Sequence, residues 1–243
     1  MLNLNTENYE LTIRNRTCQK CSKLRNHDSA YGDTYKPAKN TLEIEALNTL
    51  LAQSRDSISK VTGAKNQLDL AINQRQIKFN TLRPTATRIV NALQATDAST
   101  QIIGDTKTIN NKLQGRRTTA KSKEETQKRT ISTSQLSYDS LTENFAKLID
   151  LITAESTYKP NEQELKIETL TTYLQELQKV NTNVVNANTA YSNALISRDK
   201  TLYAGNTGLV DTALNVKKYI ISLFGATSPQ YKQISKLEFK RPK

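Results

Sequence analysis

The sequence is poor in the residues that build compact or turn-rich folds. Tryptophan is absent, phenylalanine occurs four times, and only 7 glycines and 5 prolines are spread over 243 residues. An all-β sandwich would need more of these turn residues, and a thick apolar core would need more than the 36% hydrophobic residues present. Long helices that bury one apolar stripe each need less apolar surface per residue. We therefore expect an all-α protein.

Reactive side chains are equally scarce. The chain has one histidine and two cysteines, and it lacks a phosphate-cradling glycine loop, a GxSxG motif and the Glu-x-x-His pairs of di-iron bundles. We therefore expect that the protein is not an enzyme and uses no cofactor.

Long hydrophobic runs are missing as well. No stretch approaches the roughly 18 consecutive apolar residues of a membrane span, and the first residues lack a basic segment followed by an apolar one. We expect no transmembrane segment and no signal peptide, and hence a cytoplasmic location, which two cysteines also fit.

One stretch of the sequence occurs nearly twice. Residues 34–47, TYKPAKNTLEIEAL, and residues 157–170, TYKPNEQELKIETL, are identical at eight of fourteen positions. Further identical residues follow at the same offset of 123 residues, but they are more widely spaced. The pattern favours an internal tandem duplication over two unrelated helices that share a start signal.

The TYKP element predicts where helices start. Proline is preset for the first helical turn, and the residue before it is pushed out of helical geometry. Pro37 and Pro160 should therefore mark the turns from which two helices start, with Asn40 and Asn161 as further capping residues.

The helices that follow show apolar spacing that alternates between three and four residues, typical of coiled-coil-like packing. Each should run for about 40 residues. The predicted seam of the first is Ile44, Leu47, Leu51, Ser54, Ile58, Val61, Lys65, Leu68, Ile72, Arg75, Phe79 and Leu82; that of the second is Ile167, Leu170, Leu174, Leu177, Asn181, Val184, Asn188, Tyr191, Leu195, Arg198 and Leu202.

Shorter helices should flank both long ones. Proline at 84 and glycines at 205 and 208 predict breaks after the long helices, followed by short helices through 86–93 and 209–223. A partner helix should start within 118–131 and end near residue 154, and residues 5–27 should form its counterpart. The expected architecture is an elongated bundle of antiparallel hairpins. Its predicted domains are 1–115, a basic linker 116–130, and 131–243.

The net charge of +12 is unevenly distributed. Residues 1–40 contribute +3, residues 112–130 contribute +5, residues 232–243 contribute +4, and the two long stretches between them sum to zero. Basic appendages of this kind suit contact with a polyanion or a partner, although a solvated linker explains them too. The candidate contacts are Arg116, Arg117, Lys121, Lys123, Lys128, Arg129, Lys240 and Arg241.

A possible metal site lies near the N-terminus. Cys18, Cys21 and His27 offer thiolate and imidazole ligands at short spacing, but the fourth ligand would have to be a carboxylate such as Asp28 or come from another chain. A redox pair would need a strand beside the CxxC motif. Because Cys21 aligns with the apolar position of Phe145 in the second copy, we interpret both cysteines as core residues.

Polar residues interrupt the predicted seams. Arg75 and Arg198 occupy equivalent positions of the two copies, and so do Lys65 and Asn188. Polar seam residues fix helix register and partner number. A ligand or anion site between hairpins is the alternative for the arginines.

These patterns favour a non-catalytic structural protein that acts through helix–helix contacts, with a second copy of itself as the expected partner. The first alternative is a protein associated with nucleic acid or another polyanion through its basic linker and tail. The second is a membrane-active long-helix protein, for which residues 219–226, YIISLFGA, are the longest apolar candidate.

Overall fold

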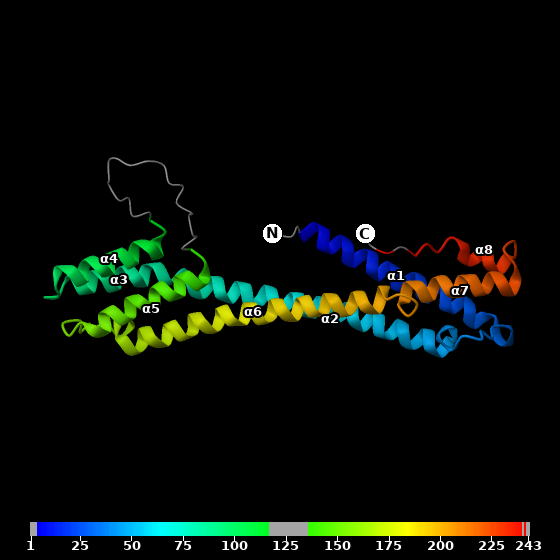
Figure 1. Ribbon diagram of the computed structural model, residues 1–243, viewed down its shortest axis with the longest axis horizontal. Helices are drawn as coiled ribbons and strands as arrows, with labels where there is room; N and C mark the ends of the chain where they lie inside the picture. The colour runs from blue at the N-terminus through cyan, green and yellow to red at the C-terminus, as the bar shows by residue number, and fades with distance from the viewer. Residues whose placement is uncertain (1–3, 117–135, 240, 242–243) are drawn as a thin grey trace, which may run out of the picture. The chain divides into compact units, whose positions relative to one another are not determined.

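The computed structural model describes residues 4–116, 136–239 and 241, and for residues 4–13 the backbone alone. The predicted all-α class is confirmed, since the described residues form helices and turns but no strand (Figure 1). The helices are α1 (Leu4–Ala30), α2 (Ile44–Asn80), α3 (Leu82–Gln94), α4 (Thr100–Gln114), α5 (Tyr138–Ala154), α6 (Ile167–Tyr203), α7 (Leu209–Phe224) and α8 (Pro229–Ser235).

The two long helices match in length and in the way they start. Both α2 and α6 have 37 residues, and each follows a short 3-10 turn, Asn40–Leu42 before α2 and Gln163–Leu165 before α6. The prediction that Pro37 and Pro160 open the helices is wrong in detail, because the helices begin seven residues later. The intervening residues are needed to form the 3-10 turn.

The predicted seams coincide with the inward faces of the long helices. Every seam residue from 44 to 82 is buried or half-buried, and the same holds from 167 to 202 except at Asn188, which is exposed. The alternating spacing therefore identified the buried stripe of each helix. The inclusion of Asn188 in that stripe was wrong, because its side chain is exposed.

The breaks after the long helices lie where proline and glycine predicted them. Pro84 is the third residue of α3, where a missing N–H costs no helical hydrogen bond. Gly208 precedes α7, and a Cβ atom there would lie 2.5 Å from the backbone nitrogen of Ala204. Only glycine fits this close approach.

The partner helices differ from the prediction at one end. Helix α1 includes the predicted range 5–27, and α5 ends at Ala154 as expected. However, α5 begins at Tyr138 and not within 118–131, because the Ser137 hydroxyl accepts a hydrogen bond from the backbone N–H of Ser140 and caps the helix there.

The helices assemble into two compact units that do not follow the predicted boundaries. Unit 1 comprises residues 1–67 and 188–243, and unit 2 comprises residues 68–187. Each unit thus combines a partner helix, the start of one long helix and the end of the other. The reason is that α7 packs onto α1, which is far from it in sequence.

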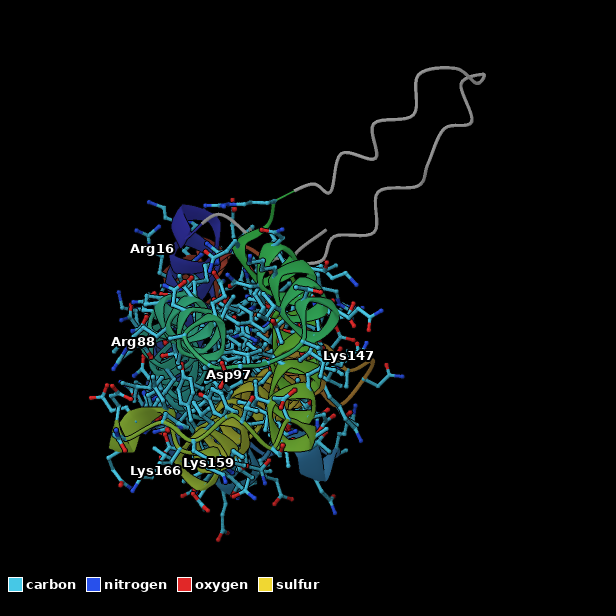
Figure 2. The ribbon with its side chains drawn as sticks, turned by 90° about the vertical axis from the view of Figure 1, so that its left-hand side faces the viewer. Arg16, Arg88, Asp97, Lys147, Lys159 and Lys166 are labelled. Carbon is cyan, nitrogen blue, oxygen red and sulfur yellow. The ribbon has the colours of Figure 1, made fainter. Side chains whose placement is uncertain are left out.

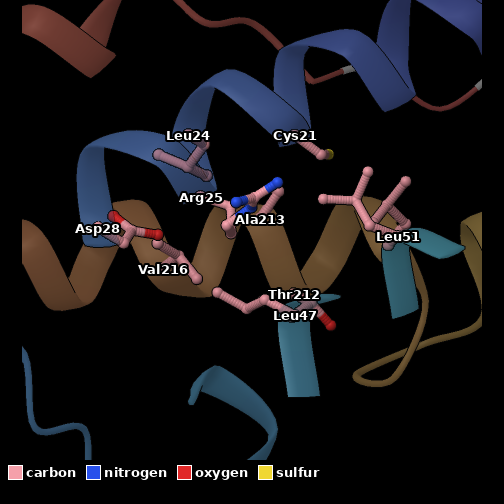
Figure 3. A pocket seen from close by; sticks show the side chains of 10 residues that line it. Cys21, Leu24, Arg25, Asp28, Leu47, Leu51, Thr212, Ala213 and Val216 are labelled. Carbon is pink, nitrogen blue, oxygen red and sulfur yellow. The ribbon is translucent and has the colours of Figure 1, made fainter. Parts of the chain in front are cut away.

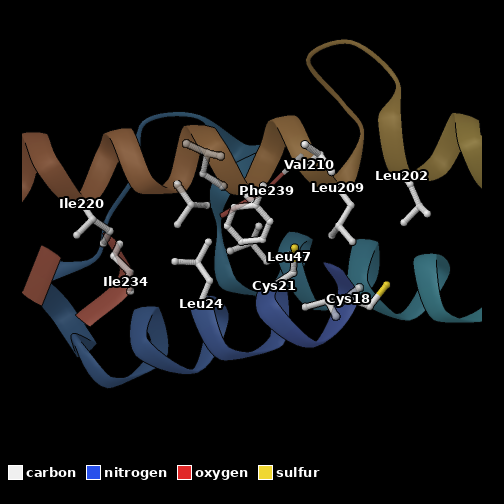
Figure 4. Packing of buried hydrophobic residues seen from close by; sticks show 14 of the residues in the cluster. Cys18, Cys21, Leu24, Leu47, Leu202, Leu209, Val210, Ile220, Ile234 and Phe239 are labelled. Atoms are coloured by element: carbon white, nitrogen blue, oxygen red, sulfur yellow. The ribbon is translucent and has the colours of Figure 1, made fainter. Parts of the chain in front are cut away.

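Each unit has its own apolar core. In unit 1, residues of α1, α2 and α7 surround Phe239 from the C-terminal segment (Figure 4). In unit 2, Phe145 and Leu148 of α5 are fully buried among residues of α3, α4 and α6.

Two helices, α4 and α8, were not predicted from the sequence. Helix α4 is capped by Ser99, ends at the left-handed Gly115, and buries Leu113 completely. Helix α8 starts with a Ser228 cap and Pro229, and its Ile234 is fully buried. Residues 229–239 thus contribute to the core of unit 1 through Ile234 and Phe239.

Candidate functional site

Two lysine side chains hold the C-terminal tail through three hydrogen bonds. Lys217 of α7 donates from Nζ to the carbonyls of Ser235 and Leu237, at 2.9 and 3.0 Å, and burial lowers the pKa of this amine. Lys20 of α1 donates to the carbonyl of Glu238 at 2.9 Å. The tail therefore lies against both α1 and α7.

Two of the eight basic residues predicted to contact a partner lie in the described part of the chain. Arg241 pairs with Asp211 at 2.6 Å and remains half-exposed, while Arg116 is exposed after α4. The remaining six predicted contacts lie outside the described residues: Arg117, Lys121, Lys123, Lys128, Arg129 and Lys240.

Folding concentrates the positive charge in one unit. Unit 1 carries 19 basic and 10 acidic residues, a net charge of +9, whereas unit 2 carries 16 and 13, a net charge of +3. Two of the three basic segments found in the sequence, the N-terminal and the C-terminal one, belong to unit 1. It is therefore the stronger candidate for contact with an anionic partner.

The CxxC pair lies on the buried face of α1. Cys18 and Cys21 are 3% and 4% exposed, both are free thiols, and both belong to the core of unit 1. Burial raises the pKa of both thiols, whereas a ligating or redox-active cysteine needs a stabilised thiolate. His27 is half-buried. The described residues contain no group of three His, Cys, Asp or Glu side chains able to hold a metal ion.

The sequence suggested Asp28 only as a possible metal ligand and did not predict that it is buried. Asp28 is fully buried, and neither of its side-chain oxygens has a hydrogen-bond partner in the described part of the chain. It lines a cavity of about 10 Å³ with Arg25 and Thr212 (Figure 3), about the space of one water molecule. Burial raises the pKa of Asp28 to about 7.

Arg75 joins three helices of unit 2. Its guanidinium carbon lies 3.9 Å from the centre of the Tyr138 ring of α5, a cation–π contact. Its Nη1 donates to Oδ1 of Asn181 on α6 at 3.0 Å. Tyr138 also packs edge-on against Phe79. This predicted seam residue thus connects α2, α5 and α6.

Arg198 occupies the matching position in unit 1 with different partners. Its side chain is 5% exposed and lies 2.8 Å from the carboxylate of Asp199, which Arg14 of α1 also approaches to 3.7 Å. Lys65 is half-buried, and Asn188 is exposed. Arg75 thus belongs to unit 2, and the other three predicted polar seam residues belong to unit 1.

The long helices also expose large aliphatic side chains. On α2, Leu70 and Ile77 are 54% and 68% exposed; on α6, Val185 and Ile196 are 58% and 69% exposed. These residues lie outside the buried stripes, so each long helix has apolar side chains on a second, uncovered face.

A groove of about 450 Å³ lies between α3 and the first half of α6 in unit 2. Arg88 pairs with Glu164 across it, and the Tyr173 hydroxyl donates to the carbonyl of Lys78 at 2.7 Å. Arg88 and two exposed lysines of the same unit, Lys159 and Lys166, are labelled in Figure 2. Both contacts are made between residues of unit 2 itself.

Comparisons with known proteins identify no relative. No family model, no curated protein and no solved structure matches the chain. Across the described residues, every helix is too short or too polar to cross a membrane. The apolar stretch 219–226 includes the end of α7, where Ile220 is fully buried in unit 1.

Proposed function

We propose that this protein is a non-catalytic structural protein that associates with copies of itself through its long helices. The observation that carries the proposal is the pair Leu70 and Ile77. They are separated by one heptad, so they lie on one face of α2, and both are more than half exposed. Exposed aliphatic side chains repeated at helical spacing favour contact with a partner helix.

A second copy is the partner that this face fits best. The four large apolar side chains that α2 and α6 expose are aliphatic, like most residues of the seams that the long helices bury. A two-fold interface would bring the same face of two copies together, and it needs no other protein. Two free, buried thiols fit the reducing conditions of the proposed cytoplasmic location.

Sedimentation equilibrium at several protein concentrations tests this proposal. The wild type should dissociate only at low concentration, and the double variant Leu70→Glu/Ile77→Glu should remain monomeric because charges replace the apolar contacts. Gln53→Glu/Gln76→Glu is the matched control, because it adds the same two charges at exposed positions of α2 that lie about 110° around the helix from Leu70 and Ile77, and it should associate like the wild type. A wild type that stays monomeric throughout would refute the proposal.

We also infer that the fold arose by tandem duplication of a helical hairpin. The support is the offset of 123 residues that relates both ends of α2 to those of α6, and the 3-10 turns before them. In the proposed pairing, α1 with α2 and α5 with α6 form the two antiparallel, coiled-coil-like hairpins. A duplicated rod-like module suits a structural role better than catalysis.

A further inference from the structure

From residue 14 to residue 26, the exposed face of α1 contains only cationic and amide side chains. Asn15, Arg16, Gln19, Lys23 and Asn26 are exposed, and the helical spacing places them along one side of the helix. The segment from Arg14 to His27 contains no acidic residue. Between residues 15 and 26 the face can therefore donate hydrogen bonds without repelling an anion.

Helix α5 provides a comparison, because its exposed face does contain acidic residues. At an offset of 124 residues the buried positions of the two helices coincide, for example Cys21 with Phe145 and Leu24 with Leu148. At the same offset, the exposed amides of α1 correspond to exposed acids of α5. The three pairs are Asn15 with Asp139, Gln19 with Glu143, and Asn26 with Asp150.

The surroundings of this face are mostly basic, with Glu238 as an exposed acid in the tail. Lys20 borders it and contacts the tail, and the tail adds the exposed Lys232 and Lys236 to the same unit. Neither residues 14–30 nor residues 226–239 expose a large apolar side chain. A membrane surface would favour apolar side chains beside the cations, so the composition favours a fully polar polyanion.

We propose that this face of α1 binds the phosphate backbone of double-stranded nucleic acid. Arginine and lysine neutralise phosphates, and asparagine and glutamine donate to phosphate and sugar oxygens. Such contacts hold the duplex without reading its sequence. The binding uses unit 1 and is separate from the apolar face on α2 that we propose for self-association.

Binding of a 20-base-pair DNA duplex to the full-length protein, measured by fluorescence anisotropy across a salt series, tests the proposal. The informative variant is Asn15→Asp/Gln19→Glu/Asn26→Asp, which gives α1 the acids of α5 and removes no basic residue. The matched control is Asn91→Asp/Gln101→Glu/Asn183→Asp, which makes the same charge change at exposed positions of unit 2. All six sites are exposed, so both variants should fold, as circular dichroism will check.

The wild type should bind, with an affinity that falls as salt rises with a logarithmic slope of about −3, since about three phosphates are neutralised. The α1 variant should bind at least about tenfold more weakly at 0.1 M salt, while the control stays close to the wild type. No binding at 50 mM salt would overturn the proposal, and so would equal weakening by both variants. Binding to vesicles that contain phosphatidylserine but not to the duplex would assign the face to a membrane and also overturn it.

Discussion

The hydroxyl of Tyr35 donates a hydrogen bond to the backbone carbonyl of Leu42, 2.8 Å away. The second copy repeats this contact, with the Tyr158 hydroxyl 3.0 Å from the carbonyl of Leu165. Both tyrosines are buried, and burial raises the pKa of Tyr158 to about 12, which keeps its hydroxyl protonated. The repeated TYKP element is thus a closed turn in which the tyrosine, and not the proline, bonds to the 3-10 turn before the helix.

Removing either hydroxyl should destabilise the protein. Tyr35→Phe or Tyr158→Phe leaves a buried carbonyl without its partner, and each should lower the free energy of unfolding by about 1–2 kcal/mol. Urea unfolding followed by circular dichroism measures this change. Tyr231→Phe, at a half-buried position of α8, is the control and should cost less. Equal stability of all three variants would contradict the role of the turn.

The buried Asp28 predicts a pH-dependent stability. Its pKa is about 7 in the folded protein against an ordinary value of 3.8. Between these values the folded protein holds a proton that the unfolded chain has released. The free energy of unfolding should therefore fall as pH rises from about 4 to about 7, and Asp28 should add no further slope above that.

Asp28→Asn should remove this slope and stabilise the protein at pH 8. The upper limit of the gain is roughly 4 kcal/mol, from the interval between the two pKa values. Urea unfolding at pH 5 and pH 8 is the measurement, and Asp33→Asn, at an exposed carboxylate, is the control. A slope that survives in Asp28→Asn would show that another group causes it.

The two cysteines should behave as core residues. Since burial raises the pKa of both thiols, they should react with Ellman's reagent at pH 8 much more slowly in the native protein than in urea. Addition of zinc or EDTA should leave the melting temperature unchanged. Rapid native labelling, or a melting temperature that depends on the metal, would instead support a thiolate site.

The tail should contribute to the stability of unit 1. Phe239 is 9% exposed and belongs to the core, so Phe239→Ala should cost about 3 kcal/mol. Lys236→Ala, at an exposed position nearby, should cost less than about 0.5 kcal/mol. Thermal unfolding of both variants compares them, and similar melting temperatures would mean that the tail adds little.

The long helices could be predicted because their signal is repeated many times. Each seam contains about a dozen residues, so a single polar position such as Lys65 does not hide the pattern. The breaks at Pro84 and Gly208 could be predicted because proline and glycine restrict or free the backbone at their own positions.

The missed features depend on few residues or on distant contacts. Helix α8 has seven residues, and one of them, Ile234, is fully buried, so no periodic pattern could reveal it. The division into units depends on α7 packing onto α1, which no local pattern encodes. The burial of Asp28 likewise depends on α7, whose Thr212 and Val216 line the same cavity and come from far along the chain.

The way the chain is divided bears on its biosynthesis. Unit 2 is one continuous stretch, residues 68–187, whereas unit 1 needs segments from both ends. As the ribosome delivers the chain, unit 2 can be completed first. The apolar side of α1 stays exposed until α7 and the final residues have emerged. During this interval a chaperone can bind it.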